Sequence, residues 1–417
     1  MIHQRPRVVV TGIGAITPLG LTVPELWDGL LAGRSGITRI TQFDASKLPC
    51  QIAGEVKGFD PNNYINPKEA RRMARCSQMV LATAQETIRD AGLEGGLPDP
   101  ERSAVLLGTA IGGWDRLTQA LKTMWTSSYE KVSPFYPPAS IPNIAGHHLS
   151  QKYHTLGPLN TVPTACAAGT QAIGEAAELI RRGAADLVLT GGVEAVVNDF
   201  TIGGFCAMRA LPINYNDSPE LASRPFTKNR EGFVFSEGCA VLVLESLPSA
   251  QQRGARILAE VLGQSSSSDA YHIAAPDPTA SGAVRAIRWA LQDAGISPEQ
   301  VDYINAHGTS TPANDSMETN AIKQVFGGRA KQTPVSSTKS MIGHPMGAAG
   351  AVEAVICVQT LRHGKIAPTI NYDTPDPECD LDYVPNTARE ADVRVTLSNS
   401  FGLGGQNACL VLGKWEE

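Results

Sequence analysis

The feature of this sequence that most constrains its fold is the alternation of short, β-branched apolar runs with helical runs rich in small residues. The alternation continues along 417 residues without a break in composition. It predicts an α/β protein whose sheets are largely buried by helices. The strand-like runs are Arg7–Thr11, Ala104–Leu107, Leu187–Thr190, Ala240–Leu244, Tyr303–Ala306 and Val393–Ser398, and the helical runs are Gln78–Ala91, Thr170–Arg182, Ser281–Ala294 and Ala348–Arg362.

Two segments of the chain resemble each other. In the first half a strand-like run leads into CAAGTQAIGEAAELI, and in the second half PVSSTKSMIGHPMGAAG leads into AVEAVICVQTL. Both are polar turns followed by helices rich in Ala and Gly, which pack closely on both sides. This favours two related halves with these helices face to face in the centre, although such helices also occur in unrelated folds. We place the boundary near Ser246–Ala255, which gives domains at 1–252 and 253–417 that share one core.

Charge and cysteine spacing argue against several classes of protein. The formal net charge of −6 disfavours broad nucleic-acid binding, which needs a dominant basic surface. The eight cysteines are scattered without a CxxC pair, so neither a zinc site nor a disulfide framework is expected. The start MIHQRPRVVVTGIG is not a signal peptide, and no window approaches the ~20 apolar residues of a membrane span. We expect a cytoplasmic protein that does not insert into a membrane.

Cys166 differs from the other cysteines in its setting. It lies in TVPTACAAGT, just after a strand and in the first turn of a small-residue helix. The positive end of the helix dipole favours a thiolate at such a position, and Gly169 leaves room for a substrate to approach. A buried structural cysteine is the alternative, and it describes most cysteines. We interpret Cys166 as a candidate nucleophile.

Three more polar side chains occupy positions typical of a functional site. His307 follows a strand in NAHGTSTPAND, where it either projects into a cleft or caps a turn. Lys339 and His344 precede an apolar helix that carries Glu353. A charge buried alone is costly, so we predict that Lys339 pairs with Glu353; the alternative is a loop with Lys339 and His344 on the surface.

Two glycine-rich segments resemble anion-binding loops. SNSFGLGGQN, at 398–407, is predicted to be a loop after a strand that directs backbone N–H groups at a negative oxygen; it lacks the GK[ST] of a phosphate loop. VVVTGIGAITPLG suggests a dinucleotide fingerprint, but Gly12, Gly14 and Gly20 do not have the GxGxxG spacing, and Pro18 falls where the helix should run. A nucleotide-binding oxidoreductase is therefore a poor alternative.

Taken together, TACAAG, NAHGTSTPAND, SSTKSMIGH, GAAG and NSFGLGG resemble the β-ketoacyl-[acyl-carrier-protein] synthases, most closely the synthase II branch that elongates chains in dissociated fatty acid synthesis. The similarity covers essentially the whole chain. It implies the thiolase fold, with two pseudo-symmetric halves in five α/β/α/β/α layers, and a homodimer. It further implies decarboxylative condensation of malonyl-carrier with an acyl chain held on Cys166. No resident cofactor is expected, because phosphopantetheine arrives on the acyl carrier protein.

The resemblance also implies roles for individual residues. The N–H groups of Cys166 and Phe401 would form an oxyanion hole, with Phe401 also acting as a gate. His307 and His344 would bind the malonyl thioester oxygen, and Lys339 would orient His344. The acyl pocket would be lined by Ile111, Phe205 and Phe233, and the pantetheine arm would be bound by Thr309 and Thr311. The acidic carrier would dock on Lys68, Arg71, Arg72 and Arg209. Some relatives hold a sodium or potassium ion at the positions of Asn305, Glu353, Ser398 and Asn399.

Other condensing enzymes carry the same residues. Synthase I-type enzymes and polyketide or aryl-polyene ketosynthases share the Cys–His–His triad, and a non-catalytic partner subunit of a condensing complex is the candidate from a different class. Cys166 argues against such a subunit, because chain-length-factor homologues have Gln at this position. Ala274 and Leu403 replace a frequent Thr and a usual Phe, which leaves carrier choice and chain length open.

Overall fold

The two halves of the chain contain matching series of strands and helices. The computed structural model describes residues 5–416. The first half contains β1 (Val8–Ile16), α1 (Val23–Leu31), β2 (Thr38–Arg39), β3 (Ile52–Ala53), α2 (Pro67–Ala70), α3 (Arg75–Asp90), β4 (Ser103–Gly108), α4 (Trp114–Thr126), α5 (Tyr136–Ser140), α6 (Ile144–Tyr153), β5 (Leu159–Val162), α7 (Ala168–Arg181), β6 (Leu187–Glu194), α8 (Asp199–Ala207), β7 (Gly238–Ser246) and α9 (Leu247–Gln252). The second half contains β8 (Ala259–Ser268), α10 (Ser281–Ala294), β9 (Tyr303–Asn305), α11 (Pro312–Phe326), β10 (Val335–Ser336), α12 (Lys339–Ile342), α13 (Ala349–His363), β11 (Lys365–Ile366), β12 (Arg389–Glu390), β13 (Val395–Gly402) and β14 (Gln406–Gly413). Short 3-10 turns are η1 (Pro61–Asn63), η2 (Tyr129–Lys131), η3 (Ala165–Ala167), η4 (Pro219–Leu221), η5 (Pro298–Gln300), η6 (Gly327–Arg329) and η7 (Met346–Ala348).

The main sheet repeats one strand order twice. Its order is β5-β4-β6-β7-β1 followed by β8-β14-β13-β9-β10, so each strand of the first half has a counterpart in the second. The halves join where β1 and β8 pair antiparallel, from Val8↔Val261 to Val10↔Ala259. The pairs β4–β5, β4–β6, β9–β10 and β9–β13 are parallel, and the other neighbours are antiparallel. The internal repeat predicted from the two Ala/Gly-rich helices is therefore confirmed.

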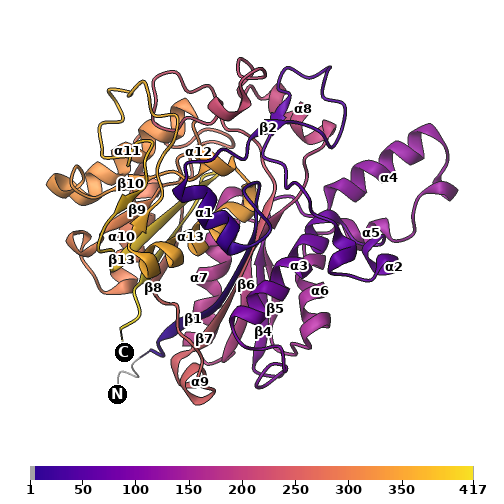
Figure 1. Cartoon of the computed structure of the whole chain (residues 1–417), viewed down its shortest axis with the longest axis horizontal. Helices are drawn as coiled ribbons and strands as arrows, with labels where there is room; N and C mark the ends of the chain where they lie inside the picture. The colour runs from indigo at the N-terminus through magenta and orange to yellow at the C-terminus, as the bar shows by residue number, and fades with distance from the viewer. Residues whose placement is uncertain (1–4, 417) are drawn as a thin grey trace.

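Helices cover the strands on both outer faces and fill the middle. α3 and α6 pack on the outer face of the first half, and α10 and α11 on the outer face of the second. α7 and α13 contact each other and strands of both halves. Figure 1 shows the first half, indigo to magenta, on one side of the molecule and the second half, orange to yellow, on the other. The predicted thiolase fold, with its five α/β/α/β/α layers, is confirmed.

Successive residues of the central strands are buried on opposite faces. In β4, Leu106 packs around the two central helices, whereas Val105 and Leu107 pack against α3. In β14, Leu410 faces the centre and Val411 faces α10. Strands buried on both faces read as continuous apolar runs. This is why the apolar runs of the sequence located the strands.

The glycines of β1 allow close helix packing and do not form a nucleotide site. Both lie inside the strand, not in a turn before a helix. A Cβ atom on Gly12 would lie 2.6 Å from the Cβ of Ala91, and one on Gly14 would lie 2.5 Å from Oγ1 of Thr87. Helix α3 therefore crosses β1 in contact with its backbone. This packing explains the glycine spacing that resembled a dinucleotide fingerprint.

The glycine-rich segment 398–407 is not a loop, and that prediction is wrong. Its first half is the end of β13, which pairs with β14 as a hairpin. Gly404 and Gly405 in the turn have φ of +85° and +72°. Residues with a side chain rarely adopt these values. Ser398 and Asn399 are buried within the strand. Polar residues at buried positions interrupted the apolar pattern from which the strand was predicted.

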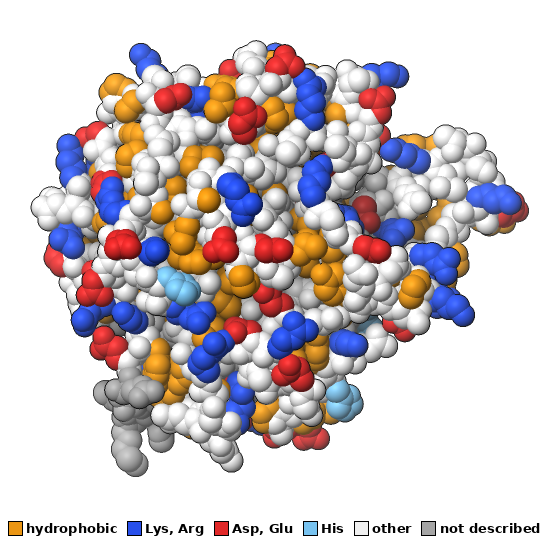
Figure 2. All heavy atoms as spheres, in the orientation of Figure 1, with side chains coloured by type: hydrophobic (Ala, Val, Ile, Leu, Met, Phe, Trp, Pro, Cys, Tyr) orange, Lys and Arg blue, Asp and Glu red, His pale blue; other side chains and the backbone are white. Residues whose placement is uncertain are grey.

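One helical segment stands apart from the body. Helix α4 projects from the molecule beside α5 (Figure 1). The face shown in Figure 2 carries acidic and basic side chains intermixed, with no field of a single sign. Within residues 5–416, no helix has the length and apolar character needed to cross a bilayer.

Candidate active site

A sharp turn between β5 and α7 presents the sulfur of Cys166. Ala165, the residue before it, has φ of +49°, a conformation that non-glycine residues rarely adopt. The second half repeats this turn: Met346 has φ of +42° at the start of η7, which aligns Gly347 with Cys166. Strained backbone of this kind costs about 1–3 kcal/mol and clusters at functional sites. The strained turn therefore indicates that Cys166 belongs to a functional site.

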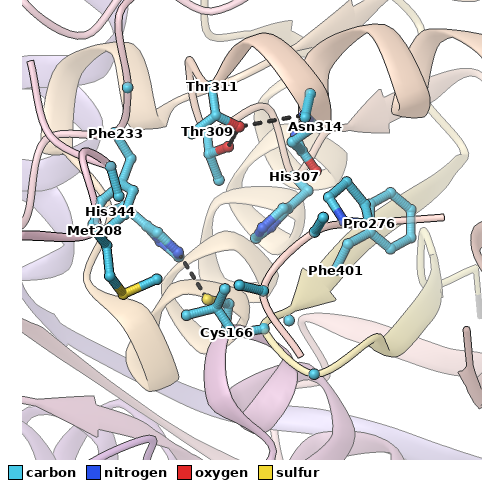
Figure 3. A pocket seen from close by; sticks show the side chains of 18 of the residues that line it. Cys166, Met208, Phe233, Pro276, His307, Thr309, Thr311, Asn314, His344 and Phe401 are labelled. Atoms are coloured by element: carbon cyan, nitrogen blue, oxygen red, sulfur yellow. Dashed lines mark hydrogen bonds between the residues drawn. The ribbon is translucent and has the colours of Figure 1, made fainter. Parts of the chain in front are cut away.

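Two imidazoles face this sulfur. His344 Nε2 lies 3.0 Å from Cys166 Sγ. The ring centre of His307 lies 5.4 Å from that of His344, at an interplanar angle of 86°. One ligand atom from each of the three residues lies within 4.8 Å of the other two. Figure 3 shows both rings directed toward the sulfur. The structure therefore brings together three residues that the sequence places on different halves.

Burial keeps all three groups neutral. It raises the pKa of the Cys166 thiol to about 11, against the lowering effects of the Leu403 amide and the Lys339 ammonium. Burial, and then the charge of Lys339, depress the pKa of His307 and of His344 well below the ordinary value. The stabilisation of a thiolate predicted from the helix dipole is therefore outweighed at the free site.

The surroundings of the two rings favour one tautomer. Within residues 5–416, neither His307 Nδ1 nor His344 Nδ1 has a hydrogen-bond partner. A hydrogen on Nδ1 would be a buried donor without an acceptor, which is costly. The neutral rings are therefore best described with hydrogen on Nε2. In that form His344 directs its N–H at the sulfur, and a thioester oxygen between the rings would meet N–H groups.

Lys339 and Glu353 form the ion pair predicted from the sequence. Lys339 Nζ contacts Glu353 Oε1, and the two side chains are 1% and 0% exposed. Burial raises the pKa of Glu353, and the neighbouring ammonium opposes that rise. Removing one partner of a buried pair leaves an uncompensated charge. The pair therefore holds in place the positive charge that acts on Cys166, His307 and His344.

A cavity of about 380 Å³ reaches the sulfur. Four of the five residues predicted to line an acyl pocket or bind the pantetheine arm do line this cavity: Phe205, Phe233, Thr309 and Thr311. Thr309 and Thr311 have their hydroxyl oxygens 3.0 Å apart (Figure 3). Ile111 does not line it and packs behind the wall, in the hydrophobic cluster that contains Cys166 and Phe233.

Phe401 lies at the inner end of this cavity, beside one of the imidazoles. Its ring centre is 5.8 Å from that of His307, at 68°, and the residue is 7% exposed. The hairpin that carries it approaches the nucleophile closely, because a Cβ on Gly402 would lie 3.3 Å from the backbone nitrogen of Cys166. The gate and oxyanion roles of Phe401 stay predictions.

Sequence reasoning did not find several residues of the site. The backbone amide of Leu403 lowers the pKa of the Cys166 thiol, and Leu403, Met208 and Asn314 line the cavity. The sequence did point to Asn314, because this residue belongs to the motif NAHGTSTPAND. In the structure its backbone N–H donates to Oγ1 of Thr311 in the first turn of α11. The signal for Leu403 is the segment SNSFGLGGQN, which is expected to direct backbone N–H groups at a negative oxygen. Which of its amides faces the sulfur follows from the hairpin turn.

The predicted carrier-docking residues occupy two places. Lys68, Arg71 and Arg72 are exposed on α2 and the turn after it, and the Arg72 guanidinium lies 4.5 Å from the ring centre of Phe135. Arg209 is also exposed and lines the cavity that reaches Cys166. The α2 residues do not line that cavity.

Three of the four residues predicted to hold a monovalent cation carry a free buried oxygen. Within residues 5–416, Asn305 Oδ1, Glu353 Oε2 and Ser398 Oγ have no hydrogen-bond partner. A bound cation can satisfy buried oxygens that have no hydrogen-bond partner. The side chain of Asn399 is already used: it donates to Glu318 and accepts from the thiol of Cys409. Asn305, Glu353 and Ser398 therefore each offer a buried oxygen, unpartnered among the described residues, of the kind that a cation binds.

Comparison with known proteins gives two family matches. The family described as "Beta-ketoacyl synthase, N-terminal domain" matches residues 5–250, and "Beta-ketoacyl synthase, C-terminal domain" matches residues 258–373. The chain is 48% identical over 413 residues to the 3-oxoacyl-[acyl-carrier-protein] synthase 2 of Synechocystis sp., covering 99% of each chain. It is 46% identical over 415 residues to the Staphylococcus aureus protein of that name, covering 100% of each.

Solved structures of ketosynthases share the fold over the whole length. A type II polyketide ketosynthase in complex with its acyl-carrier protein superposes with a TM-score of 0.92 and 35% identity, covering 99% of this chain and 100% of that one. A beta-ketoacyl synthase from Burkholderia phymatum gives a TM-score of 0.91 and 36% identity with the same coverage.

Proposed function

Because the chain belongs to the beta-ketoacyl synthase family, we propose that it condenses malonyl-[acyl-carrier protein] with an acyl chain held on Cys166, in the elongation of fatty acids. The product is a 3-oxoacyl-carrier and CO2. One observation carries the proposal: a thiol and two neutral imidazoles, Cys166 with His307 and His344, meet at the end of a cavity that an acyl thioester can enter. The enzyme is an acyltransferase.

The first half-reaction moves the acyl chain to the enzyme. The Cys166 sulfur attacks the carbonyl carbon of the acyl thioester, a bond to this sulfur forms, and the bond to the carrier's pantetheine sulfur breaks. The proton of the Cys166 thiol leaves with the departing thiol. The oxygen that becomes negative accepts hydrogen bonds from the N–H groups of Cys166 and Phe401. The close approach of Gly402 to the Cys166 backbone supports this role for the hairpin.

The second half-reaction forms the new carbon–carbon bond. Malonyl-carrier loses CO2, and the electron pair of the broken bond is delocalised onto the thioester oxygen as an enolate. The Nε2–H groups of His307 and His344 donate to that oxygen. The enolate carbon then attacks the acyl carbonyl, and the Cys166 sulfur leaves as a thiolate, which takes up a proton from solvent to restore the thiol. Because the imidazoles stay neutral in their buried setting, they stabilise the enolate without giving up a proton.

The deciding experiment supplies the purified enzyme with malonyl-carrier and acyl-carriers of graded length, and reads the products by mass spectrometry. We expect a 3-oxoacyl-carrier two carbons longer than the acyl substrate. Cys166→Ala is the control and should make none. Release of CO2 without chain extension in the parent enzyme would contradict the proposal.

The chain's partner in this reaction is an acyl carrier protein. Carrier proteins are acidic, and the exposed cations Lys68, Arg71 and Arg72 on α2 with Arg209 at the cavity offer complementary charge. Neutralising docking charges should raise KM for the carrier and leave the rate with a short pantetheine thioester unchanged. Equal losses with both substrates would argue for a role in the fold.

A second copy of the chain completes the assembly. The arm around α4 exposes large apolar side chains, and β5 is an open edge of the main sheet. The apolar side chains with the largest exposed fractions on this arm are Met124, Trp125 and Tyr129. Contiguous exposed apolar surface marks association sites, and an open sheet edge offers unpaired backbone groups. Both features support a homodimer.

A monovalent cation completes the buried polar cluster behind the site. Asn305, Glu353 and Ser398 would hold it, and it would neutralise the free oxygen of Glu353. Melting temperatures in potassium chloride and in choline chloride at equal ionic strength test this. We expect a higher value in potassium, and a smaller difference for Ser398→Ala; equal values for the parent protein would contradict a bound ion.

Two alternatives remain distinct from this proposal. A polyketide-type ketosynthase is supported by the similar fold of the type II polyketide ketosynthase, but the full-length relatives named synthase 2 are closer in identity, at 46–48% against 35%. Repeated extension without reduction would identify the polyketide activity in the product assay. A non-catalytic partner subunit is disfavoured by the complete set of Cys166, His307, His344 and Lys339.

A further inference from the structure

One buried carboxylate joins two segments that lie behind the reactive pocket, without taking part in the chemistry above. Glu194 is the last residue of β6 and is 0% exposed. Its Oε2 accepts from the backbone N–H groups of Ala110 at 2.7 Å and Gly347 at 3.2 Å. Its Oε1 accepts from the backbone of Ile111 and of Gly112, both at 3.2 Å.

A side-chain hydroxyl adds a fifth donor. Thr109 Oγ1 donates to Glu194 Oε1 at 3.1 Å and itself accepts from the backbone of Gly112 at 3.0 Å. All five partners donate, so the carboxylate form satisfies every one, whereas a proton on either oxygen would meet a donor. Within residues 5–416, no Lys, Arg or His pairs with Glu194. Four backbone N–H groups and one hydroxyl therefore hold this charge without a cationic side chain.

The two segments that Glu194 joins are in direct backbone contact. A Cβ on Gly347 would lie 2.3 Å from the backbone nitrogen of Ala110. Segment 109–112 carries Ile111, which packs behind the cavity wall. Gly347 follows Met346, which lines the cavity, and His344 lies two residues before Met346. A small shift between the segments would therefore change the inner end of the cavity.

We propose that Glu194 is a positioning residue that fixes the depth of the acyl pocket by tying segment 109–112 to Gly347. The inference rests on the proposed function, in which this cavity receives the acyl chain. Burial raises the pKa of the Glu194 carboxyl to about 7, and the amides of Ala110, Gly347 and Gly112 oppose a further rise. A carboxylate kept at such a cost in desolvation indicates a positional demand that an apolar side chain would not meet.

The test uses Glu194→Gln and measures pocket depth directly. The amide keeps the shape but turns one acceptor into a donor that faces other donors. The probes are N-alkyl iodoacetamides of graded alkyl length, which alkylate Cys166 with loss of iodide and a proton. We expect the ratio of long-chain to short-chain alkylation rates to fall about tenfold, because the misplaced hydrogen bonds let segment 109–112 shift relative to Gly347.

The matched control is Glu245→Gln. Glu245 is equally buried on the neighbouring strand, but it pairs with Leu187 at the opposite end of β6. The control should keep the parent's ratio even if it lowers the melting temperature. A Glu194→Gln variant that loses stability but keeps the parent's ratio, or an equal change of ratio in the control, overturns the proposal.

A milder variant guards against failure to fold. Thr109→Val removes one donor to Glu194 and keeps the side-chain shape. It should lower the same ratio by a smaller factor, and an unchanged ratio overturns the proposal. Because alkylation needs no carrier protein, this readout is independent of the condensation assay. Absence of condensation in the parent enzyme would contradict the proposed function. The effect of Glu194 on the ratio of alkylation rates would still be measurable.

Discussion

At the scale of single residues, the site combines reactive groups with surroundings that keep them neutral. Burial suppresses ionisation of Cys166 and protonation of His307 and His344, while Lys339, held by Glu353, places its ammonium nearby. Neutral imidazoles donate hydrogen bonds to a developing oxyanion at little cost in reorganisation. The resting enzyme is therefore arranged for charge that appears during the reaction.

Replacing the nucleophile should separate the two half-reactions. Cys166→Gln places a neutral amide where the acylated sulfur would be and leaves both histidines intact. We expect condensation to fall at least about a thousandfold, as for loss of other nucleophiles. Decarboxylation of malonyl-carrier should persist or rise, measured as CO2 release. A variant that still elongates acyl chains would show that the nucleophile is wrongly assigned.

The reactivity of the free thiol should depend on pH in a specific way. Alkylation requires the thiolate, whose fraction rises tenfold per pH unit below the pKa. With the pKa of Cys166 raised to about 11, its alkylation by iodoacetamide should still be rising between pH 9 and 10, where an ordinary thiol levels off. Peptide mapping follows this cysteine, with a cysteine in a short unstructured peptide as the reference thiol. A plateau below about pH 8 would contradict the expected direction.

At the scale of elements, the crossing of α7 and α13 positions the nucleophile. Glycines let the two backbones approach: a Cβ on Gly169 would lie 2.7 Å from the backbone nitrogen of Ala351 and 2.9 Å from the Gly347 carbonyl. Contacts this close leave no space for another methyl group. The small residues of the two helices are thus the reason that Cys166 and His344 reach each other.

A methyl group at this crossing should push the helices apart. Gly169→Ala is expected to lower the free energy of unfolding by ~1–3 kcal/mol, the usual cost of overpacking a core. It should also slow alkylation of Cys166. The control is Gly328→Ala in η6, where a Cβ meets no atom within 4 Å. Thermal melts at a fixed scan rate compare the two, and equal stability of both variants would contradict the tight crossing.

At the scale of the whole molecule, the two halves are unequal in their surfaces. The first half carries the α4 arm and the open edge of β5, whereas the corresponding edge strand of the second half, β10, is buried. Met124, Trp125 and Tyr129 of the arm are more than half exposed within the described residues of this chain. Association through the first half accounts for both features.

The arm should hold two copies together. Light scattering is expected to give about twice the chain mass of 44.2 kDa for the parent protein. Trp125 is 76% exposed on α4, and Trp125→Glu should shift the protein toward the monomer. Trp289→Glu, on α10 and 47% exposed, is the control and should stay dimeric. A parent protein that is monomeric at micromolar concentration would contradict the proposed dimer.

The sequence by itself determined the class of fold and the internal repeat, and it singled out the candidate reactive residues. Apolar runs, small-residue helices and motif residues such as Cys166 and His307 are local features. Each can be recognised within a stretch of a few residues. The Lys339–Glu353 pairing was also predictable, because a buried charge needs a counter-charge.

Only the tertiary structure decided what lies next to what. The contact of Cys166 with His344 joins residues 178 positions apart, and it depends on how two helices cross between the halves. The hairpin of residues 398–407, the place of Ile111 behind the cavity and the role of Glu194 depend on the same packing. Burial also reversed the expected ionisation of Cys166, because desolvation depends on every neighbouring atom and no short segment encodes it.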